Sequence, residues 1–285
     1  MIRLDAATVL LQWAGGGLGF LWVTSRRRQV GIGYGWLLRI SYALLAAGSV
    51  AAGLAWQPVA GRDLAAAATA MAALAALAVS VVRRRAGVAG ERARSRRRAD
   101  RVRDMLGHEA GGSRNRPDAG VAEFPPALDL VAPAFALAGL VVAGVDAGDP
   151  ALLSVVRVVA GAAFLGAVSD AMLLGHWYLV QPGLGREPLL DLVRWLALVW
   201  PLEVAALLWP TGMASVLAGT VDDGLGGLLG WIWVACAVTT LVLCAVTRAA
   251  LRERAYAAVM AATGLLYLAI LTAFGTDLIA RAVLS

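Results

Sequence analysis

The stretch "MIRLDAATVLLQWAGGGLGFLWVTSRRR", residues 1–28, combines a long apolar run with a cluster of arginines directly after it. The run is close to the length of about 20 apolar residues with which a helix crosses a bilayer. A cleavable signal peptide would end in an A-x-A-like site, which this stretch lacks, and its arginine cluster follows the apolar run. We therefore predict that it forms the first membrane span.

Apolar runs of this kind recur throughout the chain. Of the 285 residues 60% are hydrophobic, and the mean hydropathy is +0.74, whereas soluble domains are about 45–50% apolar. The alternating short strands of a β-barrel are absent from the sequence. The sequence thus predicts an all-α polytopic integral membrane helix bundle of about eight transmembrane helices. We expect the spans near residues 6–24, 33–56, 63–82, 127–146, 151–180, 188–209, 227–247 and 255–280.

Arginine placement predicts the orientation of these spans. Arg26–Arg28 follow the first span, Arg83–Arg85 follow the third, and Arg248–Arg254 lie between the seventh and the eighth. With eight spans these three loops share one side, and loops rich in Lys and Arg face the cytoplasm. We therefore expect a multi-pass protein of a bacterial cytoplasmic membrane, with the Arg-rich loops in the cytoplasm and both termini outside.

The long loop after the third span divides the chain into three parts. We predict transmembrane helices 1–3 in residues 1–82, an Arg-rich cytoplasmic loop and linker in residues 83–126, and transmembrane helices 4–8 in residues 127–285. The loop charge has two interpretations, an ordinary topology signal or a docking site for anionic lipid or an acidic partner. No nucleic-acid-binding motif accompanies it, so a nucleic acid is not among the predicted partners.

Composition excludes several kinds of chemistry. All 25 basic residues are arginine, which indicates a GC-rich, bacterial genome and excludes a Schiff-base lysine and a P-loop. Cys236 and Cys244 are about 12 Å apart along one helix, too far for a disulfide. The two histidines, His108 and His176, are not part of any metal-binding motif, so no metal site is predicted and the cofactor is unknown.

The hairpin "SDAMLLGHWYLVQPGLGREPLLDLVRW", residues 169–195, concentrates ionisable groups between two apolar runs. Asp170 lies about 15 Å from the membrane face by helix geometry, near the midplane, and Glu203 lies about 22 Å deep on the other arm. Charges at such depths are costly and usually mark a site inside the bundle. We predict Asp170 and His176 as proton-handling residues. The predicted ligand-binding residues are Arg39, Trp177, Tyr178, Asp191, Arg194 and Glu203.

Structural interpretations of the same residues remain open. Asp191 and Arg194 are three residues apart and can form a local ion pair, and Asp170 can pair with Arg39 or Arg194. The aromatic residues at the end of the fifth span can form an interfacial belt. Arg157 is expected at the outer interface, where its long side chain can reach water, and we assign it no role.

Three functions fit these features. A quinone-like or other amphipathic ligand at the hairpin would use His176 and Asp170 for hydrogen bonding and proton transfer, as part of a redox assembly. A proton-coupled transporter of a small solute would titrate Asp170 and Glu203 along a polar path. A non-catalytic structural subunit would use its charges to hold partner helices of a membrane protein. No motif of a membrane enzyme is present, so enzymatic activity is uncertain.

Overall fold

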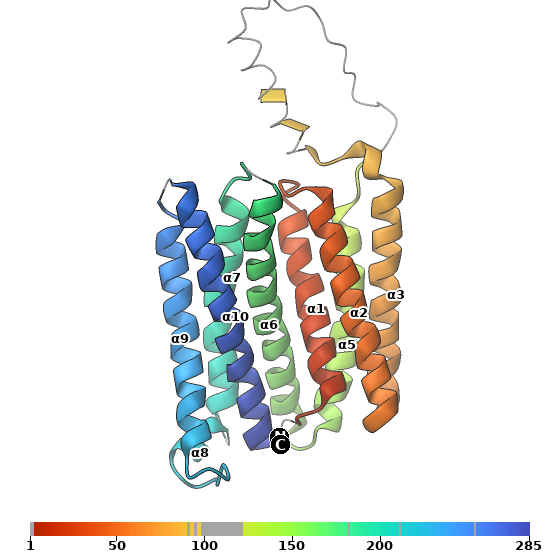
Figure 1. Cartoon of the computed structure of the whole chain (residues 1–285). Helices are drawn as coiled ribbons and strands as arrows, with labels where there is room; N and C mark the ends of the chain where they lie inside the picture. Colours follow the sequence, from red (N-terminus) through yellow and green to blue (C-terminus); the bar gives the residue numbers. More distant parts are fainter. Residues whose placement is uncertain are drawn as a thin grey trace, which may run out of the picture.

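The structure, a computed structural model, describes residues 3–89, 92–93, 96–97, 122–181, 183–210, 212–253 and 255–285. Within them, eight long helices pack side by side in one bundle (Figure 1). They are α1 (Ala6–Ser25), α2 (Ile32–Trp56), α3 (Ala60–Val82), α5 (Val131–Asp146), α6 (Ala151–Val180), α7 (Glu187–Leu208), α9 (Leu228–Ala250) and α10 (Tyr256–Leu284). The short helices are η1 (Arg84–Ala86), η2 (Pro126–Leu130) and α8 (Met213–Leu217).

The predicted membrane helix bundle is confirmed. In the described part of the chain, seven helices are long and apolar enough to cross a membrane. The remaining long helix, α7, has 22 residues and so a length of about 33 Å, but it contains four charged residues. These are Glu187, Asp191, Arg194 and Glu203. These charges set α7 apart from the seven apolar helices, but its bounds agree with the span expected at 188–209.

The two ends of the bundle differ in charge. Both ends of the chain lie at one end (Figure 1), where Nη1 of Arg281 donates a hydrogen bond to the Arg3 carbonyl oxygen at 3.2 Å. We call this the termini end. The opposite end, here the arginine end, holds the segments 26–31, 83–88, 183–186 and 251–253. The arginine clusters thus share one end, as expected for eight spans, while the membrane side that each end faces stays a prediction.

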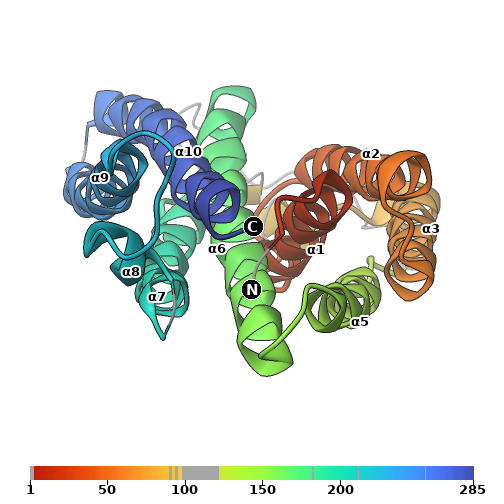
Figure 2. The ribbon, with the colours of Figure 1, turned by 90° about the horizontal axis from the view of Figure 1, so that it is seen from below.

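Helix α6 is the centre of the bundle. Seen along the bundle axis, α1, α2, α3 and α5 lie on one side of it and α7, α9 and α10 on the other (Figure 2). Its crossing with α1 is very close, because a Cβ on Gly166 would lie 2.1 Å from the backbone carbon of Gly16. Small residues permit such close approach of membrane helices. This packing brings side chains of α1, α7 and α10 against one helix.

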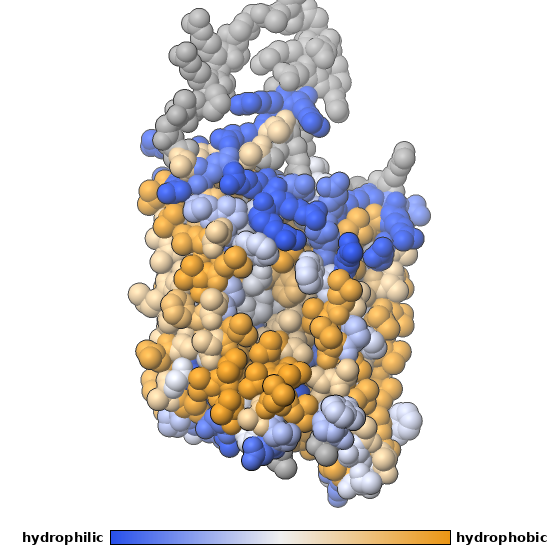
Figure 3. All heavy atoms as spheres, turned by 180° about the vertical axis from the view of Figure 1, so that it is seen from behind, coloured by the Kyte–Doolittle hydropathy of each residue, from blue (hydrophilic) through white to orange (hydrophobic). Residues whose placement is uncertain are grey.

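The outer surface of the bundle is suited to lipid. Seen from behind, hydrophobic side chains cover the middle of the bundle, and hydrophilic side chains gather at the arginine end (Figure 3). Large apolar residues such as Leu152, Leu202 and Trp209 are exposed on this surface. Because exposed apolar surface of this extent is unfavourable in water, it supports a membrane environment.

The predicted loop 83–126 is described only at its two ends. Its returning end is fixed to the bundle, since Oε2 of Glu123 lies 2.9 Å from Nη1 of Arg28 and the Glu123 carbonyl oxygen accepts from Arg83 at 3.0 Å. His108 lies outside the described residues. The expected docking role of the arginines stays a prediction.

Candidate functional site

Buried charged groups lie at three levels of the bundle. Near the termini end, Arg157, Glu203, Asp277 and Arg281 are all at most 1% exposed. Asp170 is buried between the two ends, and Arg39 pairs with Asp129 near the arginine end. The three levels differ in how many of their polar side-chain atoms have a hydrogen-bond partner. A group in which every such atom is bonded is structural, whereas one with unbonded atoms is a candidate site.

The group near the termini end is built on an ion pair within α10. Nε of Arg281 lies 2.7 Å from Oδ2 of Asp277, and both side chains are 0% exposed. The two residues are four apart in the sequence and therefore lie on one helix face. Oδ1 of Asp277 and Nη2 of Arg281 have no hydrogen-bond partner among the described residues. The pair thus keeps polar atoms available for a further interaction.

Glu203 of α7 brings a second carboxyl to this pair. Its side chain is 0% exposed, and neither of its oxygens accepts a hydrogen bond from a donor among the described residues. The carboxyl groups of Glu203 and Asp277 are nevertheless within hydrogen-bonding reach of each other. Two carboxylates repel at this distance, whereas one proton shared between them gives both a partner. A proton between the two carboxyls would remove both the repulsion and the missing partners.

Arg157 corrects our expectation from the sequence. It was expected to reach water at the outer interface, but it is 1% exposed and its Nε donates to the Ala206 carbonyl oxygen at 2.8 Å. Its guanidinium also interacts electrostatically with Glu203. The reason is that α6 is the central helix, so the face that carries Arg157 meets α7 rather than solvent. The carboxyl pair thus lies between two buried guanidinium groups.

A glycine and a glutamine complete this group on the side of α6 and α1. A Cβ on Gly161 would lie 2.6 Å from Nε2 of Gln12 and 2.8 Å from Oδ1 of Asp277. Nε2 of Gln12 donates to the Val158 carbonyl oxygen at 2.7 Å, while its Oε1 has no partner among the described residues. Only glycine at position 161 leaves room for both polar groups.

The buried group connects to a polar cavity at the termini end. This cavity has a volume of about 200 Å³, and Arg281 and Val158 are part of its wall. The other charged residues that line it are Arg3, Asp5, Arg62 and Asp146. A cavity of this size and polarity has room for several water molecules. Arg281, the ion-pair partner of Asp277, is the member of the buried group that lines this cavity.

Asp170, the principal residue predicted from the sequence, lies apart from this group. It is 0% exposed, and its Oδ1 accepts a hydrogen bond from the Tyr42 hydroxyl of α2. Its Oδ2 has no partner among the described residues. Neither Arg39 nor Arg194, the cations expected beside it, forms an ion pair with it. It is thus a buried carboxyl with a hydroxyl partner, which fits the predicted proton-handling role without testing it.

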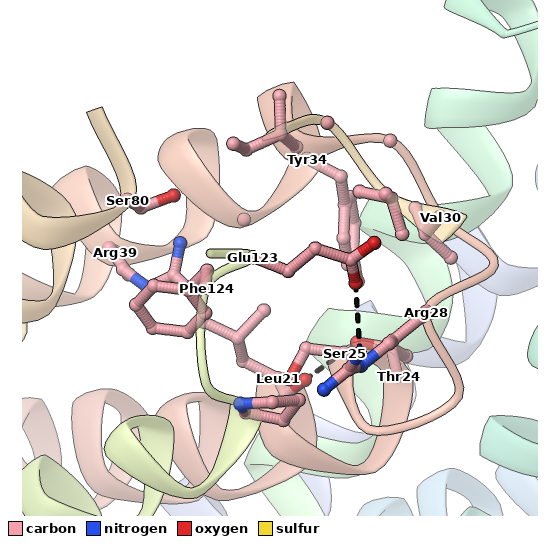
Figure 4. A pocket seen from close by; sticks show the side chains of 16 residues that line it. Leu21, Thr24, Ser25, Arg28, Val30, Tyr34, Arg39, Ser80, Glu123 and Phe124 are labelled. Carbon is pink, nitrogen blue, oxygen red and sulfur yellow. Dashed lines mark hydrogen bonds and ion pairs between the residues drawn. The ribbon is translucent and has the colours of Figure 1, made fainter. Parts of the chain in front are cut away.

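Arg39 belongs to a structural ion pair instead. Its Nε and Nη2 donate to the two carboxylate oxygens of Asp129, each at 2.8 Å, and Ser25 donates to Oδ2 at 2.9 Å. Phe124 covers the guanidinium, with 4.3 Å between Cζ of Arg39 and the ring centroid. Figure 4 shows Arg39 and Phe124 beside a small cavity at the arginine end, where Glu123 reaches Arg28. Every charge of this pair is satisfied, so it supplies stability rather than a reactive group.

The other residues predicted at the hairpin do not come together at one site. His176 is exposed, and its Nδ1 is 3.2 Å from the Tyr267 hydroxyl on α10. The Trp177 indole donates to Gln181 at 3.0 Å, and the Tyr178 hydroxyl donates to the Gly185 carbonyl oxygen at 2.5 Å.

Asp191 pairs with Arg27 at 2.5 Å rather than with its neighbour Arg194, which is exposed. His176 and Asp191 therefore contact α10 and the turn after α1 rather than each other across the hairpin. Among the predicted residues only Glu203 lies in the carboxyl group near the termini end.

Sequence reasoning missed Asp277, Arg281 and Gln12. The spacing of Asp277 and Arg281 by four residues within an apolar span was a visible signal, because a helix places them together. Gln12 carried no signal of this kind.

Comparisons of the chain with family models, with curated proteins and with solved structures gave no match. Among the residues that the structure describes, no three His, Cys, Asp or Glu side chains lie together as metal ligands would.

Proposed function

We propose that this protein is a proton-handling integral membrane protein in which the Glu203–Asp277 carboxyl pair takes up and releases a proton inside the bundle. The observation that carries the proposal is the pair itself: two fully buried carboxyls within hydrogen-bonding reach, with no other donor on the facing oxygens. Buried polar atoms without partners cost free energy, about 1–3 kcal/mol each. A proton between the carboxyls removes this cost, and its release restores it.

The surroundings of the pair support transfer of this proton. Arg281 and Arg157 interact with Glu203 and stabilise the charge that forms when the proton leaves. The cavity lined by Arg281 supplies water from the termini end. A proton taken from this water would pass to Asp277, which lies next to Arg281, and be shared with Glu203. The transferred species is a proton alone, so no cofactor is needed for this step.

Infrared spectroscopy of the protein in lipid nanodiscs tests the proposal. A protonated carboxyl has its own carbonyl band, which shifts when the proton exchanges with deuterium. We expect at least one such band in the wild type that is lost in Glu203→Gln but kept both in Asp170→Asn and in Glu253→Gln, a matched change at an exposed position. A band unchanged in Glu203→Gln, or one that does not shift in deuterated buffer, would show that the pair does not exchange protons.

Binding of an amphipathic ligand is a second candidate, supported by one observation. An apolar groove of about 860 Å³ runs between α6 and α7 on the outer surface, lined by residues such as Val156, Leu202 and Ala206. Ala206 is also the carbonyl partner of Arg157. The groove thus lies beside the backbone partner of Arg157 and offers a quinone-like ligand a place other than the hairpin.

Filling this groove tests the second candidate. Ala163 lies in the groove wall, whereas Ala51 is exposed on α2. We expect Ala163→Trp to reduce binding of a quinone analogue measured by equilibrium titration, and Ala51→Trp to leave it unchanged. Equal binding in both variants and the wild type would reject the groove as the ligand site.

A further inference from the structure

A second buried polar group surrounds Asp170, closer to the arginine end than the Glu203–Asp277 pair. Tyr42 donates to the Asp170 carboxyl, and the Tyr34 hydroxyl donates to the Asp170 backbone carbonyl oxygen at 3.3 Å. All three side chains are at most 1% exposed. The Tyr42 hydroxyl and the Asp170 carboxyl are groups that can exchange a proton along their hydrogen bond, and the Tyr34 hydroxyl lies beside them. This arrangement is separate from the Glu203–Asp277 pair.

The second site connects to the arginine end. Tyr34 and Thr24 both line the cavity drawn in Figure 4. That cavity has a volume of about 60 Å³, which is room for about two water molecules. Because Tyr34 lines this cavity and also bonds the Asp170 backbone, the cavity comes within one side chain of Asp170 from the arginine end.

A dry layer separates the two sites. Gly161, which contacts the first site, and Asp170 are nine residues apart on α6, about 13 Å along the helix. Phe164 and Leu165 between them are 0% exposed. Trp13 stacks edge-on against Phe274 with 4.7 Å between ring centroids, and its indole nitrogen donates to Ser169 at 2.8 Å. The aromatic pair thus lies between the carboxyl pair and Asp170, and we call it the aromatic barrier.

We propose that the protein moves protons across the membrane between two carboxyl sites. The Glu203–Asp277 pair is reached from the termini end, and Asp170 is reached from the arginine end. The aromatic barrier controls transfer between them. The inference rests on the proposed function, to which it adds the second site and a direction across the bilayer. A proton released by one site enters the other when the aromatic barrier opens, and the electrochemical gradient sets the direction.

The charged and titratable groups around the two sites differ, and so does the ease with which each site can lose its proton. Arg157 of α6 and Arg281 of α10 face the carboxyl pair. Around Asp170 the described titratable neighbours are Tyr34 and Tyr42 of α2, with no arginine in an ion pair. Cations beside one site and phenols beside the other mean that a negative charge is more costly at Asp170. Asp170 is therefore the site that holds its proton until a neighbouring group accepts it.

Proton flux into liposomes that contain the purified full chain tests this inference. A membrane potential is imposed with valinomycin and a potassium gradient, and a trapped dye reports the internal pH. We expect wild type and Glu253→Gln to acidify the interior. Glu203→Gln and Asp170→Asn should each slow the initial rate roughly tenfold or more. Tyr42→Phe, which keeps the ring and removes only the hydroxyl, should slow it as well.

The barrier supplies an independent readout. Trp13→Ala combined with Phe274→Ala should raise the flux, because the space that the rings fill would then adjoin the Ser169 hydroxyl, a polar group that can hold water there. Wild-type liposomes without flux above empty liposomes would overturn the inference, as would a normal rate in both Asp170→Asn and Tyr42→Phe. In either case the infrared exchange at Glu203 decides the proposed function separately, because that measurement needs access from one end only.

Discussion

Replacing Asp129 by Asn should destabilise the fold strongly, because it leaves the Arg39 charge buried without its partner. Arg39 is 2% exposed and bonds both carboxylate oxygens at 2.8 Å. With charge centres about 4 Å apart and an effective dielectric constant of about 20, the pair is worth about 4 kcal/mol. Removing one member of a buried ion pair typically costs about 3–5 kcal/mol. We expect Asp129→Asn to lower the free energy of unfolding by this amount.

Two further variants make this prediction specific. Arg39→Met combined with Asp129→Leu removes both charges, so it should recover at least about 2 kcal/mol of the loss. Asp146→Asn breaks the ion pair between Arg3 and Asp146. The Arg3 side chain is 52% exposed and that of Asp146 is 46% exposed, so the change should cost less than about 1 kcal/mol. Reversible unfolding in bicelles measures all four proteins. Equal losses in Asp129→Asn and Asp146→Asn, or a double variant no more stable than Asp129→Asn, would refute the reasoning.

Gly161→Ala should perturb the carboxyl group and cost about 1–3 kcal/mol, since its Cβ would lie 2.8 Å from Oδ1 of Asp277; thermal melts and the infrared carboxyl band check both effects. Gly166→Ala should cost about 3 kcal/mol or more, because the clash is with the α1 backbone, and its melting temperature measures this. Backbone N–H groups, Gly227 first, hold the pKa of the exposed Asp223 carboxyl below its usual value. A lowered folded-state pKa adds stability above the unfolded value of about 3.9, and this stability is lost as the pH falls towards the folded pKa. Asp223→Asn should therefore melt below wild type at neutral pH, and the difference should shrink in acid.

The sequence predicted the helices well because their limits have local causes. The span expected at 151–180 coincides with α6, since Pro150 precedes it and the turn "QPGLG" follows it. The α6–α7 hairpin follows from that short turn, and the two helices pack together. Depth in the membrane was estimated in the same way, from residue counts, and stays a prediction. These features depend on one helix or one turn at a time.

Partners of the buried charges were not predictable from the same counts. Arg39 had Asp170 as an expected partner but binds Asp129, a residue of the span after the long loop, and Asp191 binds Arg27 of the turn after α1. Such choices depend on how each helix is rotated about its axis and which helix lies beside it. The rotation and the neighbours of a helix are set by tertiary packing, for which a single sequence gives no local signal. Asp277 and Arg281 were the exception, because their pairing lies within one helix.

The contrast between satisfied and unsatisfied charges leads to one more prediction. Glu203→Gln and Asp170→Asn should unfold within about 1 kcal/mol of wild type, because each replaces a carboxyl that lacks an ion-pair geometry by a neutral group of the same shape. Asp129→Asn has the same chemistry but a charged, doubly bonded partner, so it should lose several times more. Unfolding and proton flux measured on the three variants should therefore rank them in opposite orders. A strongly destabilised Glu203→Gln would mean that its carboxyl holds Arg157 and Arg281 in place, and the group near the termini end would then be structural.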